Sequence, residues 1–219
     1  MERHQIGIII PAYNEAATIG SVVFDASKLG VAIVVDDGSS DGTGYLAKEA
    51  GAFVVRHNVN LGYDQTLNSG FIYANKSGYE YVVTMDADGQ HDPNILNKFV
   101  QALNKGSDVV IGVRDHFQRF SEHLFSWVAF FKWGMRDPLC GMKAYRMSVF
   151  RELGHFDSYD SIGTELAIYA AKSGKEITQL EVKTRRRNDA SRFGRRFSAN
   201  KKILQSLWVG FFNRQVNNC

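Results

Sequence analysis

Short apolar runs rich in β-branched residues alternate, through the first half of the sequence, with longer segments of helical periodicity. This alternation is typical of βα units, in which helices connect parallel strands and cover the faces of the sheet. We therefore predict an α/β fold: a single Rossmann-like domain with a mostly parallel central sheet flanked by helices. The predicted strands are residues 6–10, 31–36, 52–56, 81–85 and 108–112, and the predicted helices are 15–27, 42–50, 65–75 and 93–105.

The second half of the sequence is less regular. It contains an aromatic segment at 117–133, a loop at 137–145, a helix at 164–173, a strand at 177–183 and a terminal helix. No repeat or low-complexity linker divides the sequence. We predict one domain over residues 1–197 and a C-terminal amphipathic helix over residues 198–219, packed on the domain or on a membrane surface.

The composition narrows the class of protein. With 44% hydrophobic and 22% charged residues the chain can bury a core, and a net charge of +3 is too small to indicate a nucleic-acid partner. Cys140 and Cys219 form neither a disulfide framework nor a metal knuckle, which fits a reducing compartment. We find no secretory signal pattern and no apolar run near the ~20 residues of a membrane span. The expected location is cytoplasmic, soluble or peripheral on the inner face of the membrane.

Unusual polar segments follow the ends of the predicted strands. They are residues 11–15, 36–43, 58–62 and 86–92. In an open parallel sheet, ligands bind in the crevice outside the carboxyl ends of the strands. We therefore expect these loops to converge on one binding crevice.

Asp86 and Asp88 come directly after an apolar strand and are two residues apart, so their side chains should point to the same side. Hard carboxylate oxygens suit Mg²⁺ or Mn²⁺, which would neutralise a departing diphosphate. Gln90 could supply a third oxygen. The alternative is an ordinary loop with solvated aspartates.

Two further loops offer contacts for a nucleoside. The segment at 36–43 provides carboxylates and a tight turn before a helix, and the segment at 11–15 provides Tyr13 to stack on a base. Glu15 could equally be a favourable charge in the first turn of a helix.

Six motifs occur in one order along the sequence: "PAYNE" at 11–15, "DDGSSDGT" at 36–43, "NLGYDQTLNSGF" at 60–71, "DADGQH" at 86–91, "GVR" at 112–114 and "DPLCGMKAYR" at 137–146. Together they resemble family-2 glycosyltransferases with the GT-A fold, and within them the polyprenyl-phosphate sugar transferases, especially the dolichol-phosphate mannosyltransferase branch. The resemblance covers about residues 6–193. It implies an inverting, metal-dependent enzyme that moves a sugar from a UDP- or GDP-linked donor to a polyprenyl phosphate or a lipid-linked glycan, with Mg²⁺ or Mn²⁺ as cofactor.

The resemblance also implies roles for individual residues. Donor binding falls to Pro11, Tyr13, Glu15, Asp36, Asp37, Gly62, Asp86 and Ala87. Metal binding falls to Asp86, Asp88 and Gln90, and contacts to the acceptor or its phosphate fall to Arg114, Ser191 and Arg192. The implied catalytic residues are Asp88, Glu165 and Arg114.

The role of Glu165 depends on the acceptor. A hydroxyl acceptor needs a general base, whereas a phosphate acceptor is already an anion and needs only to be oriented. The plain alternative is a glutamate that stabilises the start of a helix. The sequence also departs from the branch, since Tyr63 and Asp64 stand where a basic pair is common.

Aromatic residues are concentrated at 117–133 and again in the terminal helix, both times beside basic residues. Such a mixture favours the headgroup boundary of a membrane, so we predict a pair of helices lying on the inner leaflet. The alternative is that these rings pack in the core or at the interface of a homo-oligomer.

Three other functions are weighed against a glycosyltransferase. A sugar-phosphate nucleotidyltransferase or a dehydrogenase would need a glycine-rich loop after the first strand, where this sequence has residues 11–15 instead. A non-catalytic nucleotide-sugar-binding subunit of a membrane glycosylation complex remains the non-enzymatic alternative.

Overall fold

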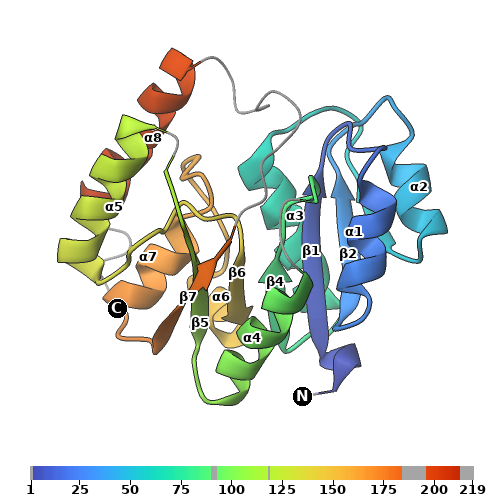
Figure 1. Ribbon diagram of the computed structural model, residues 1–219, viewed down its shortest axis with the longest axis horizontal. Coiled ribbons are helices and arrows are strands. Elements are labelled where there is room, and N and C mark those ends of the chain that lie inside the picture. Colours follow the sequence, from blue (N-terminus) through green and yellow to red (C-terminus); the bar gives the residue numbers. More distant parts are fainter. Residues whose placement is uncertain (1, 90–92, 118, 184–195, 213–219) are drawn as a thin grey trace.

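A computed structural model describes residues 2–89, 93–117, 119–183 and 196–212. Within these residues the chain forms a seven-stranded sheet with the order β3-β2-β1-β4-β6-β5-β7 (Figure 1). β6 pairs antiparallel with β4 and β5, and the other pairings are parallel. The strands are β1 (Ile6–Ala12), β2 (Val31–Asp36), β3 (Phe53–Arg56), β4 (Tyr81–Thr84), β5 (Val109–Arg114), β6 (Lys143–Arg146) and β7 (Ile177–Val182). The prediction of an α/β fold with a mostly parallel sheet is confirmed.

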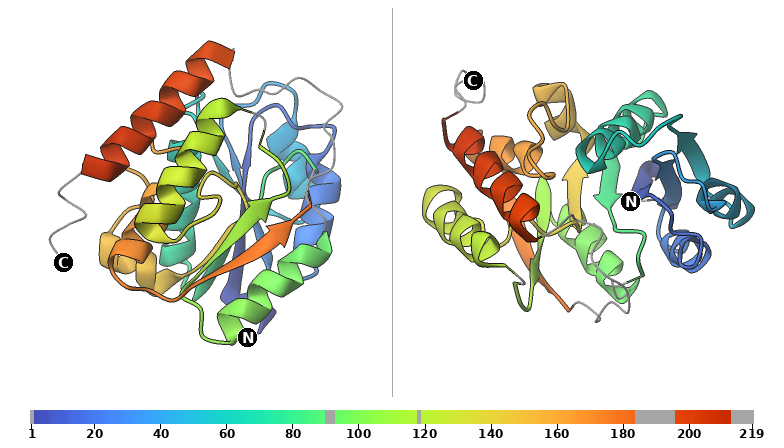
Figure 2. Two further views of the ribbon diagram at one scale, coloured as in Figure 1. Left: turned by 60° about the vertical axis from the view of Figure 1, so that its left-hand side comes forward. Right: turned by 90° about the horizontal axis from the view of Figure 1, so that it is seen from above.

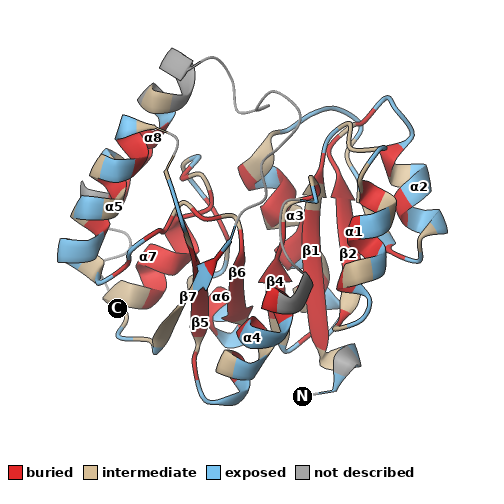
Figure 3. Cartoon of the chain, in the orientation of Figure 1, coloured by how far each residue is buried: buried red, intermediate tan, exposed pale blue. Residues whose placement is uncertain are grey.

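Helices cover both faces of the sheet (Figure 2). Side chains alternate along each strand, so that Ile9 and Ile33 enter one core while Ile8 and Val34 enter the other. Figure 3 shows the sheet buried between these two layers. The second core is closed by α1 (Ile19–Ala26), α2 (Thr43–Glu49) and α4 (Pro93–Asn104), and the first by α3 (Tyr63–Lys76), α5 (Phe120–Trp133), α6 (Met147–Leu153), α7 (Glu165–Lys172) and α8 (Arg196–Phe212).

The prediction of a loop over 137–145 is wrong in its last part, because residues 143–145 belong to β6. This strand is four residues long and begins and ends with a charged residue, so it lacks the long apolar run by which strands are recognised. Its central residues, Ala144 and Tyr145, are fully buried between β4 and β5. The short helix α6 directly after it was not predicted either.

Other element boundaries shift by a few residues. β1 extends beyond the predicted 6–10 because Pro11 and Ala12 still pair with β2. The helix predicted over 15–27 begins only at Ile19, after a turn at residues 15–18. The segment between β1 and α1 therefore comprises residues 13–18.

The described part of α8 packs on the domain beside α5 (Figure 2). Ile203 is buried, Ser206 Oγ donates to Ser161 O at 2.7 Å, and Ser121 Oγ of α5 donates to Asn200 Oδ1 at 2.7 Å. The division at residue 197 stays a prediction. Among the described residues, no helix is both long enough and apolar enough to span a bilayer.

Candidate functional site

The loops after β1 and β2 are joined by hydrogen bonds. Asn14 N donates to Ser39 Oγ at 2.9 Å, and Ser40 N donates to Asn14 Oδ1 at 3.0 Å. Asn14 has a φ of 53°, a left-handed conformation that asparagine tolerates better than most residues. Glu15 N donates to Thr43 Oγ1 at 2.8 Å. These hydrogen bonds hold the two polar loops side by side.

The loop after β1 also contacts the loop after β4. Thr18 Oγ1 donates to Ala87 O at 2.8 Å, and Ala16 N donates to Asp41 Oδ2 at 3.0 Å. Burial works to raise the pKa of Asp41, but hydrogen bonds from Thr43 and Ala16 outweigh it and lower the pKa. Three of the four predicted loops thus meet at the carboxyl edge of the sheet.

Asp36 supports the loop after β2. Its carboxylate is buried, accepts Ser39 N at 3.0 Å and lies 3.5 Å from Arg56 Nε. A Cβ on Gly44 would collide with the Oδ2 atom of Asp36, so α2 can approach this carboxylate only with glycine at that position. The structure thus shows Asp36, a residue implied to bind the donor, supporting the loop that follows it.

Asp37 holds the fourth loop. Its buried carboxylate accepts Leu61 N at 2.8 Å and Gly62 N at 2.9 Å, and its Oδ1 atom lies 2.7 Å from His57 Nδ1. The other ring nitrogen of His57 lies 2.9 Å from Ser69 Oγ. Asp37 was predicted to surround the nucleoside, and the structure shows it also fixing residues 57–62.

Asp86 and Asp88 are half-buried on either side of buried Ala87. The Asp86 carboxylate packs directly against Gly141, where a Cβ would lie 2.7 Å from Oδ1 and closer still to Oδ2. Burial and the charge of Asp86 raise the pKa of Tyr63 well above its ordinary value. Two carboxylates with hard oxygens therefore stand at this edge, and the missing side chain of Gly141 makes room for one of them.

Lys143 is a buried cation at the same edge that the sequence analysis did not single out. Its Nζ donates to Cys140 O at 2.6 Å. Burial lowers the pKa of Lys143, and the charges of Asp137 and Asp86 oppose that shift. A signal was available, because Lys143 is the one charged residue between the apolar positions 142 and 144 of the "DPLCGMKAYR" motif.

Arg114 ends β5 and is bound by two carboxylates. Its Nε and Nη2 donate to the two oxygens of Asp137 at 2.8 and 2.9 Å, and its Nη1 lies 3.7 Å from Glu122 of α5. Burial works against the charge of Arg114, but Asp137 outweighs it and raises the pKa of the guanidinium. Arg119 Nη1 donates to the same Glu122 at 2.9 Å. The sequence analysis missed both acidic partners.

Glu165 is buried at the start of α7, and its carboxylate is occupied by nearby residues. It accepts Ser158 N at 2.6 Å and Ser158 Oγ at 2.8 Å, and it lies 3.0 Å from His155 Nε2. These contacts fold the 155–161 segment over the helix start. Glu165 therefore orients the 155–161 segment.

A second acidic group lies beside Glu165. Asp64, Asp157 and Asp160 could together hold a metal ion, but backbone N–H groups account for their arrangement. Gly163 N donates to Asp64 at 2.6 Å, and Asp157 accepts the backbone of residues 160 and 161. Burial, with the charge of Asp157, raises the pKa of Asp64 to about 6.

The remaining predicted residues are placed as follows. Pro11 lies in β1, Tyr13 is exposed, and Gly62 precedes α3 with a φ of 91°. Gln90, Ser191 and Arg192 lie outside the described residues.

The sequence matches the model of the Glycosyl transferase family 2 family over residues 7–154, a stretch that contains all the crevice loops. The chain belongs to this family. Family 2 membership confirms the family resemblance, and it makes the protein a glycosyltransferase, in place of the nucleotidyltransferase and dehydrogenase alternatives.

Family 2 relatives match most of this chain. Glycosyltransferase AglJ of Haloferax volcanii is 32% identical over 84% of this chain and 64% of its own length. The undecaprenyl-phosphate mannosyltransferase of Micrococcus luteus is 29% identical over 80% of this chain and 81% of its own length.

A solved structure shares the fold. Glucosyl-3-phosphoglycerate synthase from Mycobacterium tuberculosis, crystallised with Mn²⁺, UDP-glucose and phosphoglyceric acid, superposes with a TM-score of 0.74. The match covers 95% of this chain and 79% of that one, at 23% identity. The GT-A type of the predicted fold is thereby confirmed.

Proposed function

We propose that this family 2 glycosyltransferase inverts the anomeric carbon as it transfers a sugar from a nucleoside diphosphate donor to a polyprenyl phosphate at a membrane surface. The observation that supports a lipid acceptor is that α5, which with α8 carries exposed aromatic side chains, directly contacts the carboxyl edge of the sheet. Glu122 of α5 contacts Arg114 at the end of β5. The mycobacterial neighbour with Mn²⁺ and UDP-glucose and the undecaprenyl-phosphate mannosyltransferase relative support the donor and acceptor classes.

On the donor side, the joined loops at 11–18 and 36–43 would bind the nucleoside, and Asp86 and Asp88 would hold Mg²⁺ or Mn²⁺. The two carboxylates suit these ions, which bind carboxylate oxygens and complete their coordination shell with phosphate oxygens. The bound ion would neutralise the leaving diphosphate. The protein itself holds both carboxylates at one edge of the sheet. The hydrogen bond from Thr18 to Ala87 connects the loop at 11–18 to the segment that carries them.

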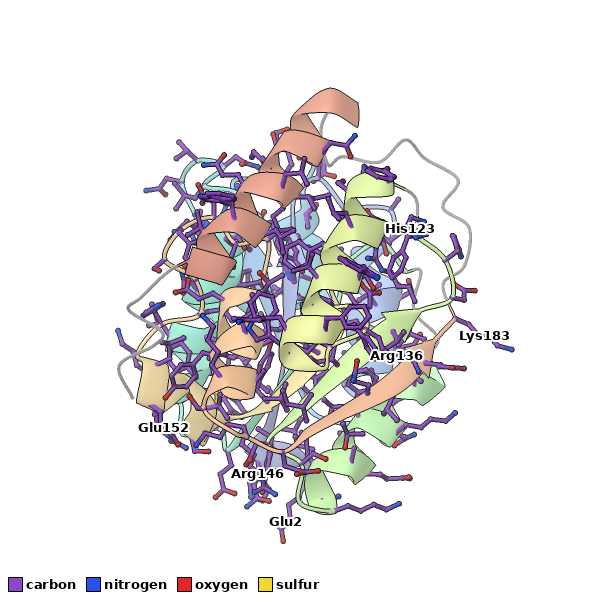
Figure 4. The ribbon with its side chains drawn as sticks, turned by 90° about the vertical axis from the view of Figure 1, so that its left-hand side faces the viewer. Glu2, His123, Arg136, Arg146, Glu152 and Lys183 are labelled. Carbon is purple, nitrogen blue, oxygen red and sulfur yellow. The ribbon has the colours of Figure 1, made fainter. Side chains whose placement is uncertain are left out.

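On the acceptor side, the aromatic face consists of large side chains on neighbouring helices. Phe120, Trp127 and Phe131 of α5 and Trp208 of α8 are each more than 60% exposed. Figure 4 looks onto this side of the molecule, with His123 projecting from α5 and Lys183 at the carboxyl end of β7. Exposed aromatic rings at this density favour the headgroup boundary of a bilayer. In this proposal the membrane helix pair is α5 and α8, although Phe125 of α5 packs in the core.

Positive charge accompanies the aromatic face. Lys132 and Lys202 are exposed on the same two helices. Arg114 and Arg119 lie together where α5 begins, and both are paired with Glu122. Anionic headgroups attract the exposed lysines, and a lipid phosphate would compete with Glu122 for the two arginines at the boundary. A phosphate acceptor also needs no general base, which agrees with the occupied carboxylate of Glu165. Ser191 and Arg192 are part of the proposed phosphate contacts.

The transfer reaction is tested with radiolabelled UDP- and GDP-sugars, Mn²⁺ or Mg²⁺, and polyprenyl phosphate in detergent or vesicles. We expect metal-dependent label in an acid-labile lipid product from one nucleotide series. The matched acceptor control is the polyprenol without its phosphate, which should remain unlabelled. Transfer to a glycan hydroxyl alone, donor binding without turnover, or pyrophosphate release from a nucleoside triphosphate and a sugar phosphate would each overturn the proposal.

The membrane contact is tested separately by sedimentation with vesicles that contain anionic lipid. Trp127→Ser should weaken vesicle binding several-fold, because it removes a large exposed ring from the face. Phe24→Ser removes a comparably exposed ring from α1, outside the face, and should leave binding unchanged. If the two substitutions change vesicle binding equally, the aromatic face does not bind the membrane.

A further inference from the structure

We propose that Lys143 is a positioning residue for Asp86: its buried ammonium group pins the turn at residues 140–141, against which the Asp86 carboxylate lies. The role rests on the proposed function, in which Asp86 holds the divalent ion and the donor diphosphate. Lys143 itself touches neither in this scheme.

The antiparallel strand β6 brings Lys143 to this edge. Lys143 is its first residue and pairs with Thr84, the last residue of β4. Thr84 Oγ1 accepts Lys143 N at 3.1 Å and donates to Gly141 O at 2.7 Å. The start of β6 is therefore locked to the strand that ends two residues before Asp86.

The ammonium group of Lys143 holds the turn at residues 140–141 through a hydrogen bond. Nζ donates to Cys140 O at 2.6 Å, while the whole side chain is 3% exposed. A buried ammonium is costly unless charges and hydrogen bonds compensate it. The carboxylates of Asp137 and Asp86 provide the opposing charge.

The turn at residues 140–141 positions the Asp86 carboxylate. Because Gly141 has no side chain, the Asp86 carboxylate rests on the backbone of the turn, with no space for even one carbon between them. A displacement of the Cys140 carbonyl would therefore move the surface on which Asp86 rests. Lys143 acts on Asp86 through two contacts, Nζ to the Cys140 carbonyl and Gly141 to the carboxylate.

Removing a group that holds a metal ligand in place typically costs about 10- to 100-fold in metal affinity. Lys143→Met replaces the aliphatic stem of the side chain with one of similar length, but it removes the ammonium group with its charge and its hydrogen bond. We expect this variant to bind Mn²⁺ at least about ten-fold more weakly in the presence of UDP or GDP. Lys143→Arg, which keeps the charge, should lose less.

Mn²⁺ binding is measured by the electron paramagnetic resonance signal of the free ion, with Mn²⁺ alone, with UDP and with GDP. The matched control is Lys172→Met, since Lys172 Nζ also donates to a backbone carbonyl, Gly210 O at 3.2 Å, but between α7 and α8. It should change thermal stability without changing Mn²⁺ affinity. A melting curve for each variant separates loss of the fold from loss of the ion.

A second variant keeps the test decisive if Lys143→Met does not fold. Gly141→Ala leaves the lysine in place and pushes directly on Asp86, so it should produce the same loss of Mn²⁺ affinity. If Lys143→Met folds and binds Mn²⁺ as the unmodified protein does, or more tightly, Lys143 does not position Asp86. Unchanged binding by Gly141→Ala would show that the turn does not hold the carboxylate, which also overturns the proposal. If the unmodified protein binds no Mn²⁺ with either nucleotide, it is the metal site of the proposed function that fails.

Discussion

His57 Nδ1 lies 2.7 Å from Asp37 Oδ1, and the opposite nitrogen of the same ring lies 2.9 Å from Ser69 Oγ on α3. One ring nitrogen therefore contacts the Asp37 carboxylate and the other contacts the Ser69 hydroxyl. His57 thereby joins the end of β2 to α3 across the 58–62 loop. The ring therefore supports the same loop that Asp37 holds through Leu61 N and Gly62 N.

We expect His57→Leu to lower the free energy of unfolding by about 1 to 3 kcal/mol, because the buried carboxylate of Asp37 loses a donor. Nucleotide binding should weaken as well, since the loop held by Asp37 loosens. Urea denaturation and a nucleotide titration measure the two effects. His4→Leu, at an exposed histidine, is the control, and identical behaviour of the two variants would contradict a special role for His57.

Gly44 and Gly20 form a matched pair of helical glycines. A Cβ at Gly44 meets the buried carboxylate of Asp36, whereas a Cβ at Gly20 meets nothing within 4 Å. Gly44→Ala should destabilise the protein by about 1 to 3 kcal/mol through overpacking. Gly20→Ala should stabilise it by about 0.5 to 1 kcal/mol through helix propensity. Thermal melts compare them, and a stabilising Gly44→Ala would mean that Asp36 can move without cost.

The pKa of Asp64, raised to about 6 from 3.8, gives a pH-dependent prediction. The folded state binds the Asp64 proton more tightly, so the stability it contributes is fully present below pH 3.8 and is lost as pH rises through about 6. Asp64→Asn cannot ionise and keeps its acceptor for Gly163 N. It should gain on the order of 2 to 3 kcal/mol over the unmodified protein between pH 4 and pH 7.

Urea denaturation at several pH values measures this difference. Asp25→Asn, on the surface of α1, should show no such pH-dependent gain. A stability difference that does not change with pH would show that Asp64 ionises normally.

The loops of the site were predictable because two independent signals coincide there. β-branched runs mark where strands such as β2 and β4 end, and parallel strands bring those ends to one edge. Asp36 is the last residue of β2 and Asp86 lies two residues beyond the end of β4, so their meeting at one edge follows from topology. Their identity as site residues came from the motifs.

The contacts made within the site were not predictable in this way. β6 is short and antiparallel, and only the sheet order reveals that it carries Lys143 to the edge beside Asp86. Asp137 and Glu122 reach Arg114 from segments 23 and 8 residues away, one in a loop and one on a helix. No local pattern encodes which carboxylate a cation will meet across such distances.

The pair of Arg114 and Asp137 should behave as a coupled unit. Asp137→Ala leaves a largely buried guanidinium without its bidentate partner, and we expect a loss of about 3 kcal/mol in the free energy of unfolding. Adding Arg114→Met should recover part of this loss, because the stranded charge is removed. A double-mutant cycle by urea denaturation gives the coupling, and additive losses would show that the two side chains act independently.

Glu165→Gln separates a positioning role from general base catalysis. The amide nitrogen that replaces one carboxylate oxygen cannot accept a hydrogen bond from Ser158. We therefore expect the free energy of unfolding to fall by about 1 to 3 kcal/mol. The turnover number should fall less than about ten-fold, because a phosphate acceptor needs no proton removed, whereas loss of a general base costs on the order of 10²- to 10⁴-fold. Ser158→Ala removes part of the same contact without changing the carboxylate and should resemble Glu165→Gln in both measurements. A thousand-fold loss of turnover in Glu165→Gln alone, with stability unchanged, would make Glu165 the base and the acceptor a hydroxyl.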